Sequence, residues 1–348
     1  MRWIPLCFAL IAFGGLAPRE GAPYSVQDRA TAETPPEPAV PFDKWLAALI
    51  EEADDKGFDD KLIAATLAGL EPLPRVIQAD RSQAELNPGL ERYLSTRLTR
   101  PVITRGREML RQHRSVLSRI EREFKVQRRF VVAIWGMETR YGRIMGREPI
   151  FRALATLAWE PRRAEYFRGE LFNALTMVQR GHINAGAMTG SWAGAMGHGQ
   201  FMPSSYLKYA VDFDENGTRD IWKSVPDALA SIANYLKGFD WQHDETWGRE
   251  VRVSAAARER ITAEVKMRTE GCFAIRNMTE RRDLEDWTTF GVRRADGSAL
   301  PRADVDASLV TTGDARTFLV YRNYEAILGY NCAHYYALSV AMLADRLQ

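Results

Sequence analysis

Apolar residues recur at helical spacing over much of this chain. The first stretch begins near Phe42, where Trp45, Leu46, Leu49 and Ile50 fall on one face of a predicted helix. The same periodicity predicts further helices at residues 62–67, two in succession over 102–143, and others over 161–179, 226–236 and 333–347.

Cap and strand signals complete this outline. Asp59 and Asp60 precede the second helix as candidate N-caps, because short polar side chains accept hydrogen bonds from the first free backbone amides of a helix. Period-two alternation predicts short strands at 251–254, 264–267 and 318–321. The chain is therefore predicted to be mainly helical, in the α+β class, with a small strand-containing lobe.

The N-terminal segment has the pattern of a secretory signal. A short basic start precedes an apolar run from Ile4 to Leu16, and small residues follow it. The run is shorter than the ~20 residues of a membrane-spanning helix, so export is favoured over a membrane anchor. Cys7 lacks the preceding small residues of a lipoprotein cleavage site, so we expect no lipid anchor. Proline-rich residues 23–41 then form a linker.

Composition narrows the classes of partner. Of the 348 residues, 46% are hydrophobic and 26% charged, as in an ordinary globular protein. The formal net charge of +2 is too small to indicate a nucleic acid partner. Cys272 and Cys332 can pair in an oxidising compartment, closing a loop of about 60 residues and stabilising the fold by roughly 4 kcal/mol. Two buried free thiols fit the sequence equally well.

One glutamate stands out chemically. Glu138 follows the uncharged run Phe130–Ile134 and lies between Gly136 and Gly142. Burial disfavours the charged form of a carboxyl group and raises its pKa, which suits a general acid near neutral pH. The flanking glycines indicate a close approach to the backbone, and Tyr141 offers a face of the kind on which sugars stack. A salt bridge from Glu138 to a neighbouring arginine is the alternative.

A glycine-rich segment, residues 190–205, carries groups expected to hold a ligand. Glycine at 190, 194, 197 and 199 would let backbone amides come close to that ligand. Ser191 and Gln200 supply polar groups, and Trp192 and Phe201 supply apolar faces, a combination suited to a neutral, hydroxyl-rich molecule. The segment lacks the Gly-Lys-Ser/Thr and G-x-G-x-x-G patterns of phosphate-binding loops.

An acidic loop after this segment matches the first positions of an EF-hand-type calcium loop, with Gly217 at the sharp turn. Position 12 holds Lys223 instead of the usual bidentate glutamate, so a carboxylate from further along the chain is needed. The candidate metal ligands are Asp212, Asp214, Asn216, Thr218 and Asp227. A solvated acidic turn is the alternative.

Several short motifs occur in a definite order along the chain. They are G-M-E-T-R-Y-G at 136–142, A-L-A-T-L-A-W at 153–159, P-R-R-A-E-Y-F at 161–167, G-S-W-A-G-A-M-G-H-G-Q-F-M-P-S-S at 190–205, A-V-D-F-D-E-N-G at 210–217, S-I-A-N-Y-L at 231–236 and G-Y-N at 329–331. In this order and spacing they resemble the lytic murein transglycosylase B family of bacterial cell-wall enzymes. The resemblance covers roughly residues 42–347.

The resemblance implies a reaction. Family enzymes cleave the β-1,4 bond between N-acetylmuramic acid and N-acetylglucosamine without water and leave a 1,6-anhydro end. By this resemblance Glu138 is the single catalytic residue, acid first and base second, so the second carboxylate of most glycosidases is not needed. No cofactor takes part in catalysis, and a structural calcium ion would occupy the acidic loop. The implied substrate-binding residues are Ser191, Gln200, Tyr330, Asn331 and Tyr336.

Two departures from the family pattern concern these sites. The spacing to Asp227 is one residue longer, and Gly329 stands where the family often has arginine.

The resemblance also implies a layout, with a lysozyme-like helical catalytic domain between flanking lobes. The predicted order is a signal peptide (1–22), a linker (23–41), an N-terminal helical lobe (42–105), the catalytic core with the EF-hand-like loop (106–245), a small mixed α/β lobe (246–315) and a C-terminal segment completing the substrate groove (316–348). We expect a periplasmic monomer that acts on peptidoglycan glycan strands, without nucleic acid and without a stable membrane anchor.

Three rival functions are open at this level. A non-catalytic peptidoglycan-binding protein would use the groove but not Glu138. Ser205 and Lys208 form the S-x-x-K pattern of penicillin-interacting acyl enzymes, but the S-D-N and K-T-G partners are missing. Zinc chemistry is the third, and the histidines lack the H-E-x-x-H spacing.

Overall fold

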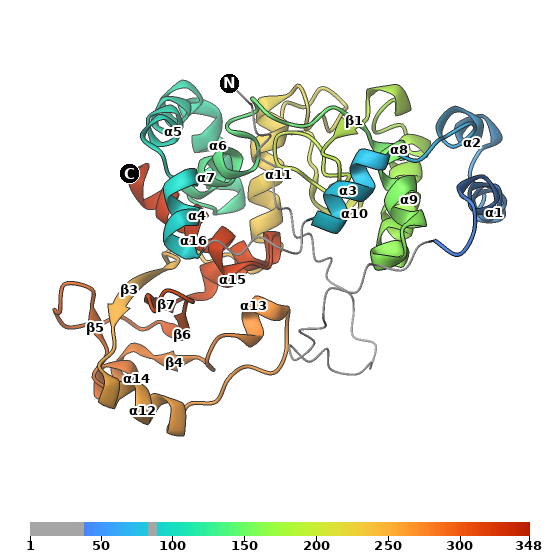
Figure 1. Cartoon of the computed structure of the whole chain (residues 1–348). Helices are drawn as coiled ribbons and strands as arrows, with labels where there is room; N and C mark the ends of the chain where they lie inside the picture. Colours follow the sequence, from blue (N-terminus) through green and yellow to red (C-terminus); the bar gives the residue numbers. More distant parts are fainter. Residues whose placement is uncertain (1–37, 83–88) are drawn as a thin grey trace, which may run out of the picture.

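The computed structural model describes residues 38–82 and 89–348. The protein is mainly helical, with one five-stranded antiparallel sheet set to one side of the helices (Figure 1). This arrangement confirms the predicted fold class. The signal expected at 1–22 and most of the linker lie outside the described residues.

The N-terminal helices bury single apolar faces. Their bounds are α1 (Phe42–Asp55), α2 (Asp60–Thr66), α3 (Pro74–Ser82) and α4 (Leu90–Arg97). In α1 the buried residues are spaced four, three and four apart, as the periodicity predicted. Asp59 caps α2 by accepting hydrogen bonds from the backbone N–H groups of Lys61 and Leu62, which confirms that prediction.

Three helices, not the predicted two, cover residues 100–139. They are α5 (Arg100–Gln112), α6 (Arg114–Phe124) and α7 (Arg128–Thr139). α6 ends where Lys125 takes a left-handed conformation, with φ of 59°. Neither glycine nor proline marks this turn, so the apolar periodicity of the sequence gives no sign that a helix ends there.

Four further helices follow: α8 (Ile150–Trp159), α9 (Ala164–Gln179), α10 (Pro203–Tyr209) and α11 (Val225–Lys237). The helices predicted over 161–179 and 226–236 are confirmed, the first with a 3₁₀ turn at its start. α8 lies along α9, which also contacts α2 and α10. Directly before α8, β1 (Glu148–Pro149) pairs with β2 (Thr189–Gly190), which precedes α10. This pairing joins the loop after α7 to the glycine-rich segment.

The small lobe holds an antiparallel sheet in the order β4-β6-β7-β3-β5. Its strands are β3 (Gly248–Arg252), β4 (Arg282–Asp283), β5 (Arg293–Arg294), β6 (Asp306–Thr311) and β7 (Thr317–Val320). Its helices are α12 (Ala255–Glu264), α13 (Phe273–Arg276) and α14 (Leu284–Thr289). The predicted strands at 251–254 and 318–321 are confirmed as β3 and β7, within a few residues.

Part of this lobe forms a second hydrophobic core, whereas Met278, Val310 and Phe318 belong to the core of the helices. Trp287 is fully buried in the second core, and its indole Nε1 donates a hydrogen bond to the carbonyl oxygen of Ala307. The strand predicted at 264–267 is wrong. α12 runs to Glu264, and only Met267 forms an isolated bridge, to Thr279, so the apparent alternation came from a helix end followed by a single extended residue.

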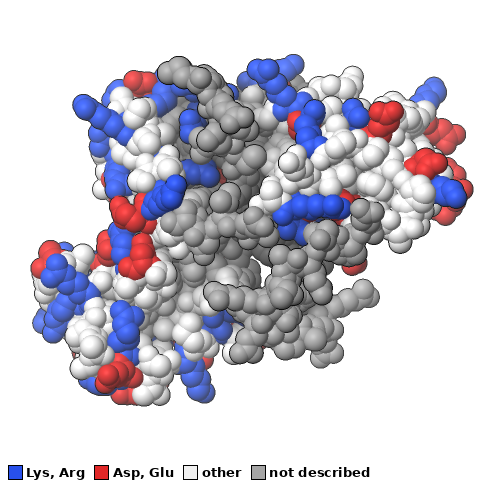
Figure 2. Space-filling model, in the orientation of Figure 1, with Lys and Arg blue, Asp and Glu red and all other residues white. Residues whose placement is uncertain are grey.

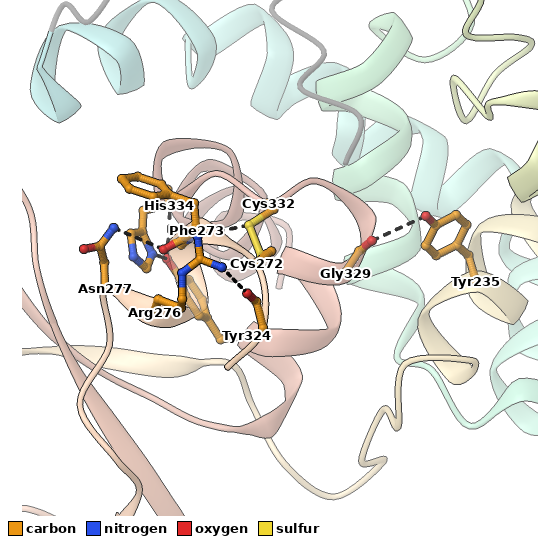
Figure 3. The surroundings of a disulfide bond; sticks show 11 residues. Tyr235, Cys272, Phe273, Arg276, Asn277, Tyr324, Gly329, Cys332 and His334 are labelled. Atoms are coloured by element: carbon orange, nitrogen blue, oxygen red, sulfur yellow. Dashed lines mark hydrogen bonds between the residues drawn. A yellow bond between two sulfur atoms is a disulfide. The ribbon is translucent and has the colours of Figure 1, made fainter. Parts of the chain in front are cut away.

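The chain then returns to the helical part through α15 (Arg322–Tyr330) and α16 (His334–Arg346). α16 lies along α7 and also contacts α4, and α15 contacts α11 and α13 (Figure 1). A disulfide joins Cys272, at the start of α13, to Cys332, between α15 and α16, with Cα atoms 6.3 Å apart (Figure 3). Of the two alternatives for these cysteines, the structure has the paired one.

The described residues carry no helix that is both long and apolar enough to cross a membrane. Basic and acidic side chains are interspersed over the face shown in Figure 2, in keeping with the small net charge of the whole chain.

Candidate functional site

Glu138 lies near the end of a buried helix. Every residue of α7 from Phe130 to Thr139 is buried, and Glu138 is only 2% exposed. This burial raises the pKa of Glu138 to about 7, while the Tyr336 hydroxyl and the positive charge of Arg97 oppose the rise. A large fraction of these carboxyl groups is therefore protonated at neutral pH, as a general acid requires.

The alternative of a salt bridge is not realised in the described structure. Arg140 and Arg143 are exposed, and neither forms an ion pair with Glu138. Burial is instead the largest influence on its pKa, and the Tyr336 hydroxyl and the Arg97 charge offset that influence only in part.

Three buried polar atoms at the site have no hydrogen-bond partner among the described residues: Glu138 Oε1, Asn331 Oδ1 and Tyr336 Oη. The Tyr336 hydroxyl lies close enough to Glu138 to lower its pKa, although it does not satisfy Oε1 with a well-formed hydrogen bond. Buried polar groups without partners cost free energy. Hydroxyl and amide groups of a ligand would satisfy them.

Tyr330 belongs to the same cluster. Its hydroxyl donates a hydrogen bond of 2.5 Å to the carbonyl oxygen of Gly199, and burial together with the Glu138 charge raises the pKa of this tyrosine. The end of α15 is thereby joined to the glycine-rich segment beside Glu138.

The backbone reverses sharply after Glu138. Arg140, Tyr141 and Gly142 have φ of 50°, 62° and 80°. The reversal folds the Tyr141 ring onto Gly136, where an added Cβ would lie 2.6 Å from a ring carbon, and the hydroxyl donates to the carbonyl oxygen of Val102. Tyr141 is 6% exposed, so the expectation that it offers a sugar-stacking face is wrong. Gly136 makes room for this tyrosine, not for a ligand.

The glycine-rich segment is folded tightly against the protein's own backbone. An added Cβ would lie 2.2 Å from the carbonyl oxygen of Ala195 at Gly190, and 2.5 Å from that of Ile221 at Gly197. The expectation that these two glycines admit a ligand is therefore wrong. They let the loop pack, and the loop in turn presents its side chains.

Ser191 and Gln200 differ in their freedom to bind a ligand. Ser191 is half-buried, and its Oγ accepts hydrogen bonds from two backbone N–H groups of its own loop, so its hydroxyl hydrogen remains to donate. Gln200 is 6% exposed and has φ of 53°. Its Nε2 donates to the carbonyl oxygens of Met145 and Gly197, which fastens the turn after α7 to the glycine-rich segment.

The acidic loop brings three carboxylates together. Oxygen atoms of Asp212, Asp214 and Asp227 lie within 4.8 Å of one another. Asp227 is fully buried, burial raises its pKa, and its two oxygens accept three backbone N–H bonds from the loop. Asn216 Oδ1 accepts from the backbone N–H and the hydroxyl of Thr218. Carboxylate oxygens in such a cluster suit a hard cation such as Ca²⁺, so these residues fit the expected ion.

Two residues near Glu138 come from α4, which carries no motif. The Arg97 guanidinium lies 5.1 Å from the centre of the Tyr93 ring, and burial, with a smaller contribution from the Glu138 charge, raises the pKa of Tyr93. Only ordinary helical periodicity marks α4 in the sequence. The contact between α4 and α16 brings these side chains to the site, and no sequence signal could have assigned them to it.

The geometry does not support the acyl-enzyme site of the S-x-x-K pattern or a zinc site at the histidines. The ammonium group of Lys208 lies over the ring of Tyr209, 5.0 Å from its centre, and the His198 Nδ1 accepts a hydrogen bond from the Trp135 indole. Over residues 38–82 and 89–348, the acidic loop is the one place that gathers three potential metal-binding carboxylates, imidazoles or thiolates.

Comparison with known proteins gives a consistent picture. The family described as "Transglycosylase SLT domain" matches residues 41–345. The chain is 39% identical over 195 residues to the membrane-bound lytic murein transglycosylase B of Escherichia coli (strain K12). That alignment covers 53% of this chain and 54% of the relative, so the match spans about half the length of each protein.

Solved structures extend the similarity over most of the chain. SltB3 from Pseudomonas aeruginosa, in complex with NAG-anhNAM-pentapeptide, has a TM-score of 0.78 and 39% identity, covering 87% of this chain and 78% of that one. The Escherichia coli lytic transglycosylase Slt35, in complex with calcium, has a TM-score of 0.71 and 29% identity, covering 87% and 92%.

Proposed function

The chain belongs to the transglycosylase SLT domain family of lytic murein transglycosylases, and we propose that it cleaves peptidoglycan glycan strands with Glu138 as acid and then as base. One observation carries this proposal. The Glu138 carboxyl group is 2% exposed, its pKa is raised to about 7, and its Oε1 has no partner in the described structure. Such a group can both donate and accept a proton near neutral pH.

One carboxyl group suffices when the substrate supplies its own nucleophile. Protonated Glu138 donates its proton to the glycosidic oxygen as the bond from that oxygen to C1 of N-acetylmuramic acid breaks. The 2-acetamido carbonyl oxygen stabilises the positive charge at C1. The C6 hydroxyl of the same sugar then attacks C1, and the Glu138 carboxylate takes its proton. The product carries a 1,6-anhydro ring, Glu138 is protonated again, and no water is consumed.

The neighbouring residues suit an N-acetylated sugar. Asn331 offers an unpartnered buried acceptor and Ser191 a free hydroxyl hydrogen, which complement the N–H and C=O of an acetamido group. The ligand in the SltB3 structure supports this class of substrate. The residues proposed to bind the strand are Ser191, Gln200, Tyr330, Asn331 and Tyr336.

The substitution Glu138→Gln tests the catalytic role. Glutamine keeps the shape of the side chain but cannot donate or take up the proton, so the rate is expected to fall by about 10²–10⁴-fold. The measurement is mass spectrometry of muropeptides released from sacculi, with the wild type yielding anhydro-ended products.

Glu170→Gln is the matched control. Glu170 is another buried carboxyl group, but both its oxygens are bound by Ser204 at the start of α10, so it should retain most of the activity. Near-normal release by Glu138→Gln would reject the assignment.

We further propose that the acidic loop binds a structural calcium ion through Asp212, Asp214 and Asp227, with Asn216 and Thr218 shaping the loop. Calcium should then raise the thermal unfolding temperature of the wild type, since a ligand that binds only the folded state stabilises it. Asp214→Asn, which alters an exposed ligand, should lose most of that gain, whereas its exposed neighbour Glu215→Gln should keep it. An unfolding temperature that does not respond to calcium would reject the site.

The location is also a proposal. We propose a periplasmic monomer without an anchor. The N-terminal sequence pattern supports the export, although the Escherichia coli relative is named as membrane-bound. Cell fractionation should recover the protein in the soluble periplasmic fraction. Recovery with the membranes would argue for an anchor.

A further inference from the structure

We propose that Phe239 is a stacking platform for a sugar ring of the glycan strand, and that it extends the Glu138 site outward. This inference rests on the proposed function, because it assigns a further contact to the same substrate. Phe239 follows α11 and is 36% exposed, whereas the tyrosines that link it to Glu138 are buried or half-buried.

A series of aromatic contacts leads from Glu138 to Phe239. The ring centres of Tyr336 and Tyr330 lie 6.5 Å apart, those of Tyr330 and Tyr235 4.4 Å apart, and those of Tyr235 and Phe239 5.4 Å apart. The first and last pairs are nearly parallel, with interplanar angles of 11° and 12°. We call these four residues the aromatic ladder. It begins at the residue whose hydroxyl lowers the pKa of Glu138 and ends at the exposed ring of Phe239.

The ring of Phe239 occupies space that only a glycine at position 329 leaves open. A Cβ added at Gly329 would lie 2.3 Å from Cδ1 of Phe239 and 2.6 Å from both Cγ and Cε1. Tyr235 also contacts this glycine, because its hydroxyl donates to the Gly329 carbonyl oxygen at 3.4 Å (Figure 3). Gly329, the departure noted in the sequence, therefore lets Phe239 pack beside α15 and join the ladder.

The backbone also holds the ring in place. The N–H of Phe239 donates to the carbonyl oxygen of Leu236, and Tyr209 fills the space beside Gly238 while packing against Tyr235. Phe239 is thus a ring that its neighbours hold in place but leave 36% exposed, and the aromatic ladder connects it to residues proposed to bind the strand. An uncharged pyranose presents an apolar face of C–H groups that matches such a ring, which has no polar group of its own.

The experiment compares wild type and Phe239→Ala on peptide-free glycan strands of two lengths. On long strands the KM should rise by about 2- to 10-fold, the range expected for one aromatic contact, with kcat nearly unchanged. The shortest cleavable strand should show no change because it does not reach Phe239. Phe239→Trp should restore the KM. Phe273→Ala, which removes an exposed ring outside the ladder, is the matched control and should behave like wild type.

A second variant tests the geometry itself. Gly329→Ala should displace the Phe239 ring and raise the KM on long strands, but should add nothing in the Phe239→Ala background. An unchanged KM for Phe239→Ala, or equal changes on both lengths, would each overturn the proposal. These outcomes differ from failure of the proposed function, in which the wild type itself releases no anhydro-ended products.

Discussion

At the residue scale, the chemistry of Glu138 depends on opposing influences on one carboxyl group. Burial raises its pKa, and the Tyr336 hydroxyl and the Arg97 charge limit the rise to about 7. In the proposed mechanism the first proton transfer requires the protonated form, so activity should be lost as pH rises through this pKa. In the proposed mechanism, burial of Glu138 therefore places the upper pH limit of activity, and side chains from α4 and α16 adjust it.

Tyr336→Phe should move that limit. Removing the hydroxyl removes an influence that lowers the pKa of Glu138, so the pKa should rise and the alkaline fall in kcat/KM should shift to higher pH. The measurement is a pH–rate profile on soluble glycan strands. Tyr335→Phe, which alters the adjacent residue whose ring contacts Tyr93, should leave the profile in place. An alkaline limit that stays fixed or moves to lower pH in Tyr336→Phe would contradict this account.

At the scale of the element, the turn after α7 packs back against the helix and holds it in place. Arg140, Tyr141 and Gly142 reverse the chain, and the Tyr141 ring returns to cover Gly136 and Gly106. Trp135 packs edge-on against the same ring and donates its indole hydrogen to His198. The position of Glu138 therefore depends on close packing between α7 and its own C-terminal turn.

Gly136→Ala should destabilise the protein although alanine favours helices. Its Cβ would meet the Tyr141 ring at 2.6 Å, and overpacking of this kind costs about 1–3 kcal/mol. Urea denaturation measures the change in unfolding free energy.

Gly169→Ala is the matched control on α9. Nothing lies within 4 Å of its added Cβ, so it should stabilise the protein by up to about 1 kcal/mol. Equal stabilisation by both substitutions would show that Tyr141 does not occupy the space beside Gly136.

At the scale of the whole molecule, the site is completed by a segment nearly 200 positions after Glu138. The chain passes through the small lobe, which holds the second core, before α15 and α16 bring Tyr330, Asn331 and Tyr336 to α7. The disulfide ties that lobe to the residue directly after Asn331. The disulfide therefore links the small lobe to the segment between α15 and α16, next to the site.

Removing this bond should lower stability substantially. Closing a loop with 60 residues of separation is worth about 4 kcal/mol in the chain-entropy model, so a Cys272→Ser/Cys332→Ser variant should unfold at lower urea concentration. A reducing agent should produce the same shift in the wild type and none in the double variant. A wild type that does not respond to the reducing agent, under conditions that fully reduce its thiols, would contradict the prediction.

Much of this protein could be predicted from local sequence. Periodicity located α1, α2, α9, α11 and α16, because a helix with one buried face must repeat its apolar residues at helical spacing. Motif order identified the family, and the apolar run before Glu138 indicated its burial. The break at Lys125 and the sheet register were not predictable, since neither leaves a local signal.

Only the tertiary structure decided which side chains, distant in the sequence, contact one another. The sequence by itself determined the fold class, the family and the unusual glutamate. It did not reveal that Gly136 and Gly190 accommodate the protein's own atoms, that Arg97 acts on Glu138, or that Gly329 makes room for Phe239. Backbone preferences and apolar periodicity act over a few residues and can be read along the chain. The pKa of a buried carboxyl group and the fit of a ring against a glycine depend on atoms that only packing brings together.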